Sequence, residues 1–115
     1  PSKDHMHLFS SNEVIGGEVA KFLNYRKEDI SMATKVPVTS VRYDSKMPTE
    51  LKERLFEWAI AINLVAEFFN DREKTILWFS TPNPILGDMS PRNMIKVGRF
   101  NKLLKFIQTA ISENN

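Results

Sequence analysis

One segment, from Pro48 to Asp71, constrains the fold most, because apolar residues cover every side of the single helix that it predicts. One stripe at helical spacing comprises Leu51, Leu55, Trp58, Ala59, Ile62, Val65, Ala66 and Phe69. The opposite side carries Phe56, Ile60, Leu64 and Phe68. Between Trp58 and Ala66 the only polar residue is Asn63. A helix that is apolar all round must be buried on most sides. The segment therefore predicts either the central helix of a small domain or a helix at a subunit interface.

The rest of the chain also favours helices, so we predict an all-α fold. Helices are expected over residues 16–25, 27–35, 72–79, 92–97 and 99–113, and a turn followed by a short helix over 36–44. Ser90 and Pro91 suit an N-cap and a first helical position, and Gly98 suits a helix end. No strand-like alternation extends beyond a few residues. Residues 1–12 are polar and predict a disordered N-terminus.

Composition sets the class of protein. The chain has 115 residues, enough for one domain, and its net charge of +2 is too weak to indicate nucleic-acid binding. It has no cysteine, which excludes disulfides and thiolate metal sites and fits a cytoplasmic location. The start, PSKDHMHLF, lacks the pattern of a secretory signal. The most apolar run, Trp58 to Ala66, is far shorter than the ~20 residues of a membrane span.

Patterns that would support catalysis or metal binding are missing from the sequence. His5 and His7 have a spacing that can chelate a metal, but no third ligand is nearby. Gly16 and Gly17 lack the preceding strand of a phosphate-binding loop, and no histidine is placed to activate a serine or threonine. We therefore predict a binding or regulatory module that is not an enzyme and uses no cofactor and no metal.

The proline segment WFSTPNPILGDMSP, from Trp78 to Pro91, interrupts the helices. Thr81-Pro82 and Asn83-Pro84 force an extended path that no helix can follow. Gly87 permits a sharp reversal, and Ile85 and Leu86 are expected to pin the segment onto neighbouring helices. The result is a rigid loop. It is either a stiff corner in a helical bundle or a surface that is presented to a partner.

The run from Trp78 to Ile107 resembles the toxin-binding domain of the Xre/MbcA/ParS antitoxin family. The resemblance rests on a tryptophan before a T-P-N-P turn, a leucine-glycine pair, an S-P helix start, a glycine about seven residues on, and a leucine-rich final helix, with the spacing kept. It covers roughly residues 48–112. One departure is Asp88, where many members have a second glycine.

The resemblance implies an antitoxin of a type II toxin–antitoxin system. Such antitoxins bind and neutralise RES-domain toxins, which consume NAD, and their C-terminal domain covers the toxin's NAD site. The family's antitoxins commonly form homodimers and often repress their own operon through an N-terminal helix-turn-helix. We therefore expect the toxin-binding domain to span residues 48–115. The residues that we expect to bind the toxin are Trp78, Pro82, Asn83, Pro84, Leu86, Arg92, Arg99 and Lys102.

The last part of this domain also concentrates positive charge. Between Arg92 and Lys105 no residue is acidic, and the basic residues are Arg92, Lys96, Arg99, Lys102 and Lys105. This clustering has three alternative explanations. The residues complement an acidic or phosphate-binding toxin cleft, they contact a DNA backbone, or they serve solubility and occupy favourable positions on helices. Arg99 is singled out because it lies in the G-R-F segment that resembles the family.

The N-terminal part, residues 13–47, is similar to a reduced helix-turn-helix subdomain. The third helix of such a motif enters the major groove of DNA. The residues expected to contact operator DNA are Thr39, Ser40, Arg42, Tyr43 and Lys46. The turn holds Lys35 in place of the usual glycine, and the reading helix has only about two turns before Met47. The alternative is a three-helix subdomain that packs and does not read DNA.

Three interpretations follow. We favour an antitoxin that binds a RES-domain toxin and regulates its operon. The second is a stand-alone helix-turn-helix DNA-binding transcriptional regulator without a toxin partner, and the third is a helical scaffold protein. A RES-domain partner would separate the first from the second.

Overall fold

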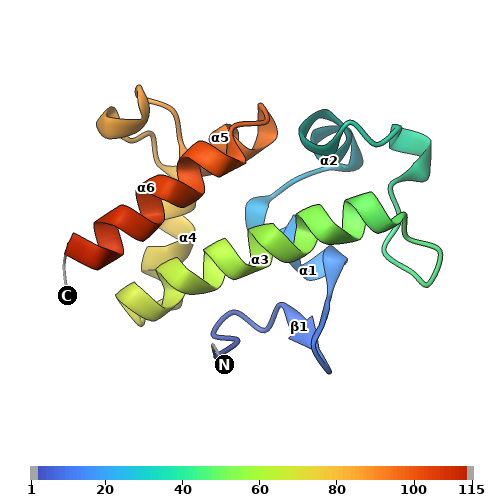
Figure 1. Ribbon diagram of the computed structural model, residues 1–115, viewed down its shortest axis with the longest axis horizontal. Helices are drawn as coiled ribbons and strands as arrows, with labels where there is room; N and C mark the ends of the chain where they lie inside the picture. Colours follow the sequence, from blue (N-terminus) through green and yellow to red (C-terminus); the bar gives the residue numbers. More distant parts are fainter. Residues whose placement is uncertain (1–2, 114–115) are drawn as a thin grey trace.

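The computed structural model describes residues 3–113, and in this part of the chain the fold is all-α apart from one small hairpin, as predicted (Figure 1). The hairpin consists of β1 (Phe9–Ser10) and β2 (Glu13–Val14). The α-helices are α1 (Gly16–Leu23), α2 (Lys27–Thr34), α3 (Thr49–Phe69), α4 (Arg72–Ser80), α5 (Pro91–Lys96) and α6 (Phe100–Glu113). Two short 3-10 helices are η1 (Val38–Ser40) and η2 (Pro84–Leu86). Every helix of the described chain is too short or too polar to cross a membrane.

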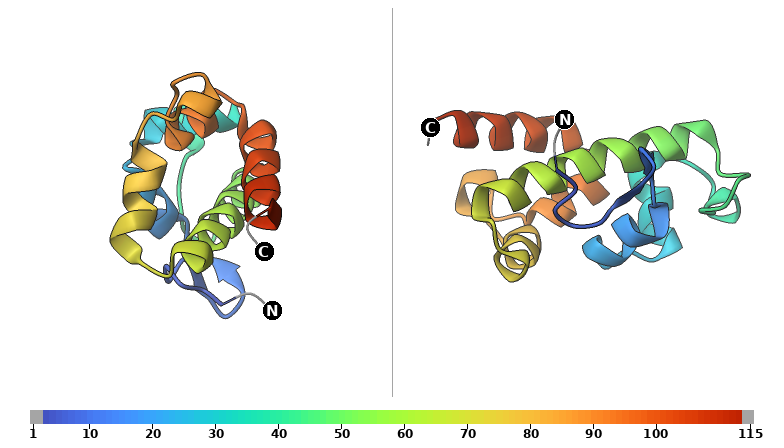
Figure 2. Two further views of the ribbon diagram at one scale, coloured as in Figure 1. Left: turned by 90° about the vertical axis from the view of Figure 1, so that its left-hand side faces the viewer. Right: turned by 90° about the horizontal axis from the view of Figure 1, so that it is seen from below.

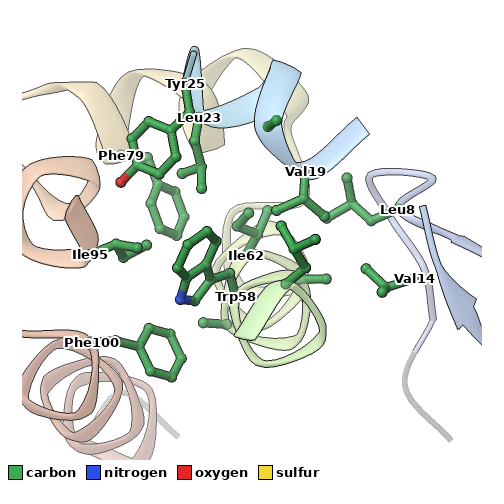
Figure 3. Close-up of a cluster of buried hydrophobic side chains, with 14 of the residues drawn as sticks. Leu8, Val14, Val19, Leu23, Tyr25, Trp58, Ile62, Phe79, Ile95 and Phe100 are labelled. Atoms are coloured by element: carbon green, nitrogen blue, oxygen red, sulfur yellow. The ribbon is translucent and has the colours of Figure 1, made fainter. Parts of the chain in front are cut away.

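Helix α3 is the central element, and α1, α4 and α6 all pack against it. Its first apolar stripe is buried as predicted, and the indole of Trp58 is 1% exposed. Figure 3 shows this ring among Tyr25, Phe79, Ile95 and Phe100, which come from four other parts of the chain. A single tryptophan thereby joins the two halves of the sequence in one core.

The second apolar side of α3 is only partly covered. Phe56 is 44% exposed and Phe68 is 49% exposed, whereas Ile60 and Leu64 are half-buried between them. The N-terminal segment covers part of this side, and the ring of Phe9 meets that of Phe56 edge-on at 5.5 Å between centroids. Helix α3 is therefore central to the fold, but it is not buried all round.

Residues 3–14, which we call the N-terminal arm, lie against α3 (Figure 2). The expected disorder of residues 1–12 is wrong for residues 3–12, and residues 1–2 lie outside the described chain. Met6 and Leu8 are buried in the core, and β1 pairs with β2. Asn63 holds the arm on α3, since its side-chain oxygen accepts from Met6 N at 3.1 Å. Long-range contacts, which a local reading of polarity cannot detect, order this segment.

The predicted signals of the C-terminal helices are confirmed. The side chain of Ser90 caps α5 by accepting from Asn93 N at 3.3 Å, and Pro91 occupies the first turn. Gly98 has a φ of +83°, a conformation that favours glycine, and it lies between α5 and α6. Helix α6 then packs alongside α3 and runs in the same general direction (Figure 1).

The buried side chains form one cluster that extends from Met6 to Ile107. Helix α1 contacts α3 and α4, and α2 contacts α5. The core therefore continues across Met47 and Pro48, where the sequence suggested a boundary between residues 13–47 and 48–115. The consequence for the candidate site is that its supports come from both parts of the chain.

Candidate partner-binding site

The connection between α4 and α5, residues 81–90, is called the proline loop here. It closes on Asn83, whose carbonyl oxygen accepts from Leu86 N at 2.9 Å and from Asp88 N at 3.0 Å. Asn83 N donates to Met89 O at 3.1 Å, and its side-chain oxygen accepts from Ile85 N at 3.0 Å. One residue thus satisfies the loop through both its backbone and its side chain, which makes the loop a structured unit.

The prolines and two left-handed residues give the loop its course. Pro82 and Pro84 flank Asn83, and Pro84 starts η2. The predicted reversal at Gly87 is present, with a φ of +70°, and Asp88 follows with a φ of +65°. Aspartate tolerates this region better than most residues. Asp88 thus adopts, without glycine, the kind of backbone conformation that glycine favours.

The apolar residues of the loop face in two directions. Leu86 and Met89 are half-buried and pack against the core, as expected for a pinned loop. Ile85, in contrast, is 76% exposed, so the expectation that it would find an apolar home is wrong. Leu77, on α4, is 65% exposed. These two are the most exposed large apolar side chains of the described residues, and both lie in or beside the proline segment.

Trp78 supports this region from beneath. Its ring stacks on that of Phe106 in α6, with 6.5 Å between centroids and 5° between planes, and meets the ring of Phe79 edge-on. Trp78 also lines an apolar cavity of about 120 Å³ between the end of α3 and α6. It is half-buried and joins α4 to α6 at the start of the proline segment.

Arg92 points back into the protein. Its Nε donates to Leu23 O at 2.7 Å and an Nη donates to Asn24 O at 3.0 Å. The guanidinium carbon lies 5.3 Å from the centroid of the Tyr25 ring, and the Tyr25 hydroxyl donates to Arg92 O. Burial raises the pKa of Tyr25 far above its ordinary value, although Arg92 opposes the shift, so the hydroxyl stays a donor.

The other basic residues of this region separate into two groups. Lys96 pairs with Asp29 of α2 at 3.2 Å. Burial alone would raise the pKa of Asp29, but hydrogen bonds from Arg26 N and Lys96 outweigh it and lower the pKa. Arg99, Lys102 and Lys105 are exposed, and no ion pair holds any of them within residues 3–113. Two of the predicted toxin-binding cations, Arg99 and Lys102, are therefore available to a partner.

The residues predicted to contact DNA are not brought together on a helix. Thr39 and Ser40 lie on the three-residue η1, and the expected helix of about two turns is wrong, because the chain turns extended at Val41. Arg42 is bound by both carboxylate oxygens of Asp44, at 2.7 and 2.6 Å. The two remaining residues, Tyr43 and Lys46, lie outside any helix, as Arg42 does.

Tyr43 and Lys46 illustrate why that helix does not form. Tyr43 is half-buried against α1, where a Cβ on Gly16 would lie only 2.7 Å from the Tyr43 ring. Lys46 N donates to the Asp44 side chain at 3.0 Å, which closes a local turn in place of a helical one.

Sequence reasoning missed three residues of the candidate site. They are Tyr25, which contacts Arg92, and the exposed Leu77 and Ile85. No local signal marks Tyr25.

Within residues 3–113, no three His, Cys, Asp or Glu residues gather in a group that could hold a metal ion.

No family model matches the sequence, and no curated protein matches it. Among solved structures, a chain in the crystal structure of the M. tuberculosis MbcT–MbcA toxin–antitoxin complex is similar, with a TM-score of 0.54 and 21% sequence identity. The similarity covers 82% of this chain and 87% of that one. At this level of identity the comparison establishes a shared fold.

Proposed function

We propose that this protein is an antitoxin that binds and neutralises a RES-domain, NAD-consuming toxin. The observation that carries the proposal is the fold shared with a chain of the MbcT–MbcA toxin–antitoxin complex, over most of both chains. The sequence resemblance of the proline segment to the Xre/MbcA/ParS toxin-binding domain supports it independently of the fold.

The proline loop is suited to this role because its shape exists before binding. Its hydrogen bonds to Asn83 fix the backbone, so little conformational entropy is lost when a partner docks. Ile85 supplies an exposed apolar side chain between Pro84 and the turn at Gly87. Pro82 and Pro84 are exposed as well. A rigid loop with an apolar tip is a suitable anchor for a pocket on another protein.

Arg99 and Lys102 give the proposal its electrostatic part. Both are exposed at the start of α6, directly after α5, and neither is neutralised within the described chain. Acidic groups around the toxin's cleft would attract them, which speeds association and orients the complex. Arg92 does not belong to this group, because its donors already bind Leu23 and Asn24.

Substitution of Arg99 tests the electrostatic part. We expect Arg99→Ala to weaken toxin binding by roughly tenfold, mainly through slower association at low salt. The matched control is Lys21→Ala on α1, which removes an exposed cation from another helix and should leave affinity unchanged. Binding kinetics measured at two salt concentrations distinguish the two variants. An unchanged affinity of Arg99→Ala would remove Arg99 from the site.

The proposal as a whole is tested by a tagged pull-down of this chain from its native host, with bound proteins identified by mass spectrometry. A RES-domain protein that co-purifies in stable proportion supports the proposal. NAD levels in cells that express this protein with and without the antitoxin then report neutralisation. A folded, abundant chain that captures no RES-domain protein would leave the proposal without its central prediction.

The proposal includes a homodimer joined at the partly exposed side of α3. Phe56 and Phe68 leave an apolar stripe that the N-terminal arm covers only in part, which supports association. Molecular size measured at several concentrations tests this point, and a strictly monomeric chain would exclude it. The proposal does not include operator DNA, because Arg42 is bound to Asp44 and no reading helix is formed.

A further inference from the structure

The interior of the proline loop is closed by its own hydrogen bonds, so besides the packing of Leu86 and Met89 its position depends on its two ends. At the α4 end, Thr81 Oγ1 donates to Leu77 O at 2.6 Å, which continues the last turn of the helix. At the α5 end, Ser90 is buried and caps the helix, and Pro91 is buried beside it. The next residue, Arg92, is the first in this stretch whose hydrogen bonds reach a distant part of the sequence.

The contact between Arg92 and the turn after α1 runs in both directions. Tyr25 donates its hydroxyl to the carbonyl oxygen of Arg92, and the Arg92 guanidinium donates to the carbonyl oxygens of Leu23 and Asn24. These carbonyls lie at the end of α1, where a helix has unsatisfied acceptors and favours a cation. The planar guanidinium also lies against the Tyr25 ring. Tyr25 thus holds the backbone of Arg92, while Leu23 and Asn24 hold its side chain.

We propose that Tyr25 and Arg92 form a lock that positions the proline loop for its partner, and that Arg92 is a positioning residue, not a partner contact. The role in partner binding rests on the function proposed above. Tyr25 is 8% exposed and Arg92 directs two of its donors inward, so the pair serves the shape of the site. The turn after α1 therefore controls a surface that is almost 70 residues away in sequence, since Arg92 and Leu23 are separated by 69 positions.

The first test uses the free chain and amide hydrogen exchange. Tyr25→Phe removes the hydroxyl and keeps the ring, and Arg92→Lys keeps the charge and loses the planar fork. If the lock positions the loop, both variants raise the exchange rates of Asn93 N and Met94 N, which donate to Ser90 at the α5 end of the loop. We expect an increase of roughly tenfold, the size expected for one charged or buried hydrogen bond. Unchanged exchange in both variants would overturn the proposal, whatever the partner is.

Lys96→Gln is the matched control in this test. It also removes a hydrogen-bonded cation from α5, but its partner is Asp29 of α2 and it lies one turn farther from the loop. We expect exchange at Asn93 N and Met94 N to remain as in the unmodified chain. Equal acceleration by Lys96→Gln would mean that any loosening of α5 suffices, and the specific role of Tyr25 and Arg92 would be wrong.

The second test uses the RES-domain protein recovered with the unmodified chain. A lock predicts that Tyr25→Phe and Arg92→Gln each weaken binding by roughly tenfold and that the double variant is no weaker than either, because both break one unit. The salt dependence of association should stay unchanged in Arg92→Gln. Additive losses with a shallower salt dependence would make Arg92 a direct contact. If the unmodified chain binds no such protein, the proposed function fails, while the exchange result still decides whether the lock exists.

Discussion

The N-terminal arm and the proline loop both run outside the α-helices, and an asparagine holds each of them. Asn63, on α3, binds the arm from outside by accepting from Met6 N and donating to Asp4 Oδ1. Asn83 lies inside the proline loop and closes it from within. The arm therefore takes its shape from the body of the protein, whereas the loop carries its shape in its own sequence.

This difference explains what the two segments can do. Met6 and Leu8 are buried by the arm's docking, so the arm contributes to the core. The loop leaves Ile85 exposed and keeps its backbone satisfied without help from a partner. A segment of the first kind stabilises the fold. A segment of the second kind can present a surface before any partner arrives.

Truncation of one apolar side chain in each segment gives the largest expected contrast. Leu8 is 1% exposed, so Leu8→Ala should lower the free energy of unfolding by about 3 kcal/mol. Ile85 is 76% exposed, so Ile85→Ala should change it by less than about 0.5 kcal/mol while weakening toxin binding. Urea denaturation of both variants measures the contrast. Equal destabilisation would show that the arm and the loop do not differ in this way.

The two asparagines allow a second, smaller contrast. Asn63→Ala leaves Met6 N without its acceptor and removes one of the hydrogen bonds to the Asp4 carboxylate. We expect a loss of about 2 kcal/mol with faster amide exchange in the arm. Asn83→Ala removes one cap-like bond to Ile85 N, and we expect a loss of about 1 kcal/mol confined to the loop. Exchange measured residue by residue locates each effect. If Asn63→Ala left the arm protected, docking by Asn63 would be wrong.

The smallest expected effect concerns pH and the arm. Burial alone would raise the pKa of Asp4, but hydrogen bonds from Leu8 N, Asn63 and Phe9 N outweigh it and lower the pKa below its ordinary value. A depressed pKa contributes stability that is present above the unfolded value and is lost as pH falls through the folded value. The stability difference between the unmodified chain and Asp4→Asn should therefore be present at pH 7 and vanish in acid below that folded pKa. A gap that persisted there would contradict this role of Asp4.

Local signals account for what the sequence could predict. Ser90 caps α5, Gly98 lies at the break before α6, and Gly87 reverses the loop, because each acts on its nearest neighbours. The stripe of α3 is likewise a pattern within one helix. The fold class and the shape of the proline loop follow from such signals, whereas the fate of Ile85 depends on whether a neighbouring helix reaches it.

The interactions that sequence reasoning missed join distant residues. Asn63 binds Asp4 across 59 positions, and Arg92 binds Leu23 across 69. The polar N-terminal sequence predicts disorder because it does not reveal that Asn63 will bind the arm. Arg92 lies near the family motif and therefore predicts a partner contact, because the sequence does not reveal its internal acceptors. The predicted reading helix does not form for a different reason. The side chain of Asp44 accepts hydrogen bonds from Lys46 N and from Arg42, and this local turn competes with a helix.

The bond from Arg92 to the end of α1 also has a consequence for synthesis of the chain. Leu23 and Asn24 are synthesised long before Arg92. The carbonyl oxygens at the end of α1 therefore emerge without the arginine that binds them, and α2 emerges without α5, against which it packs. The N-terminal half therefore has no complete core of its own while it is being made. Fragments released before residue 92 should be substrates for proteases and chaperones, and resistance should appear only once α5 and α6 have been translated.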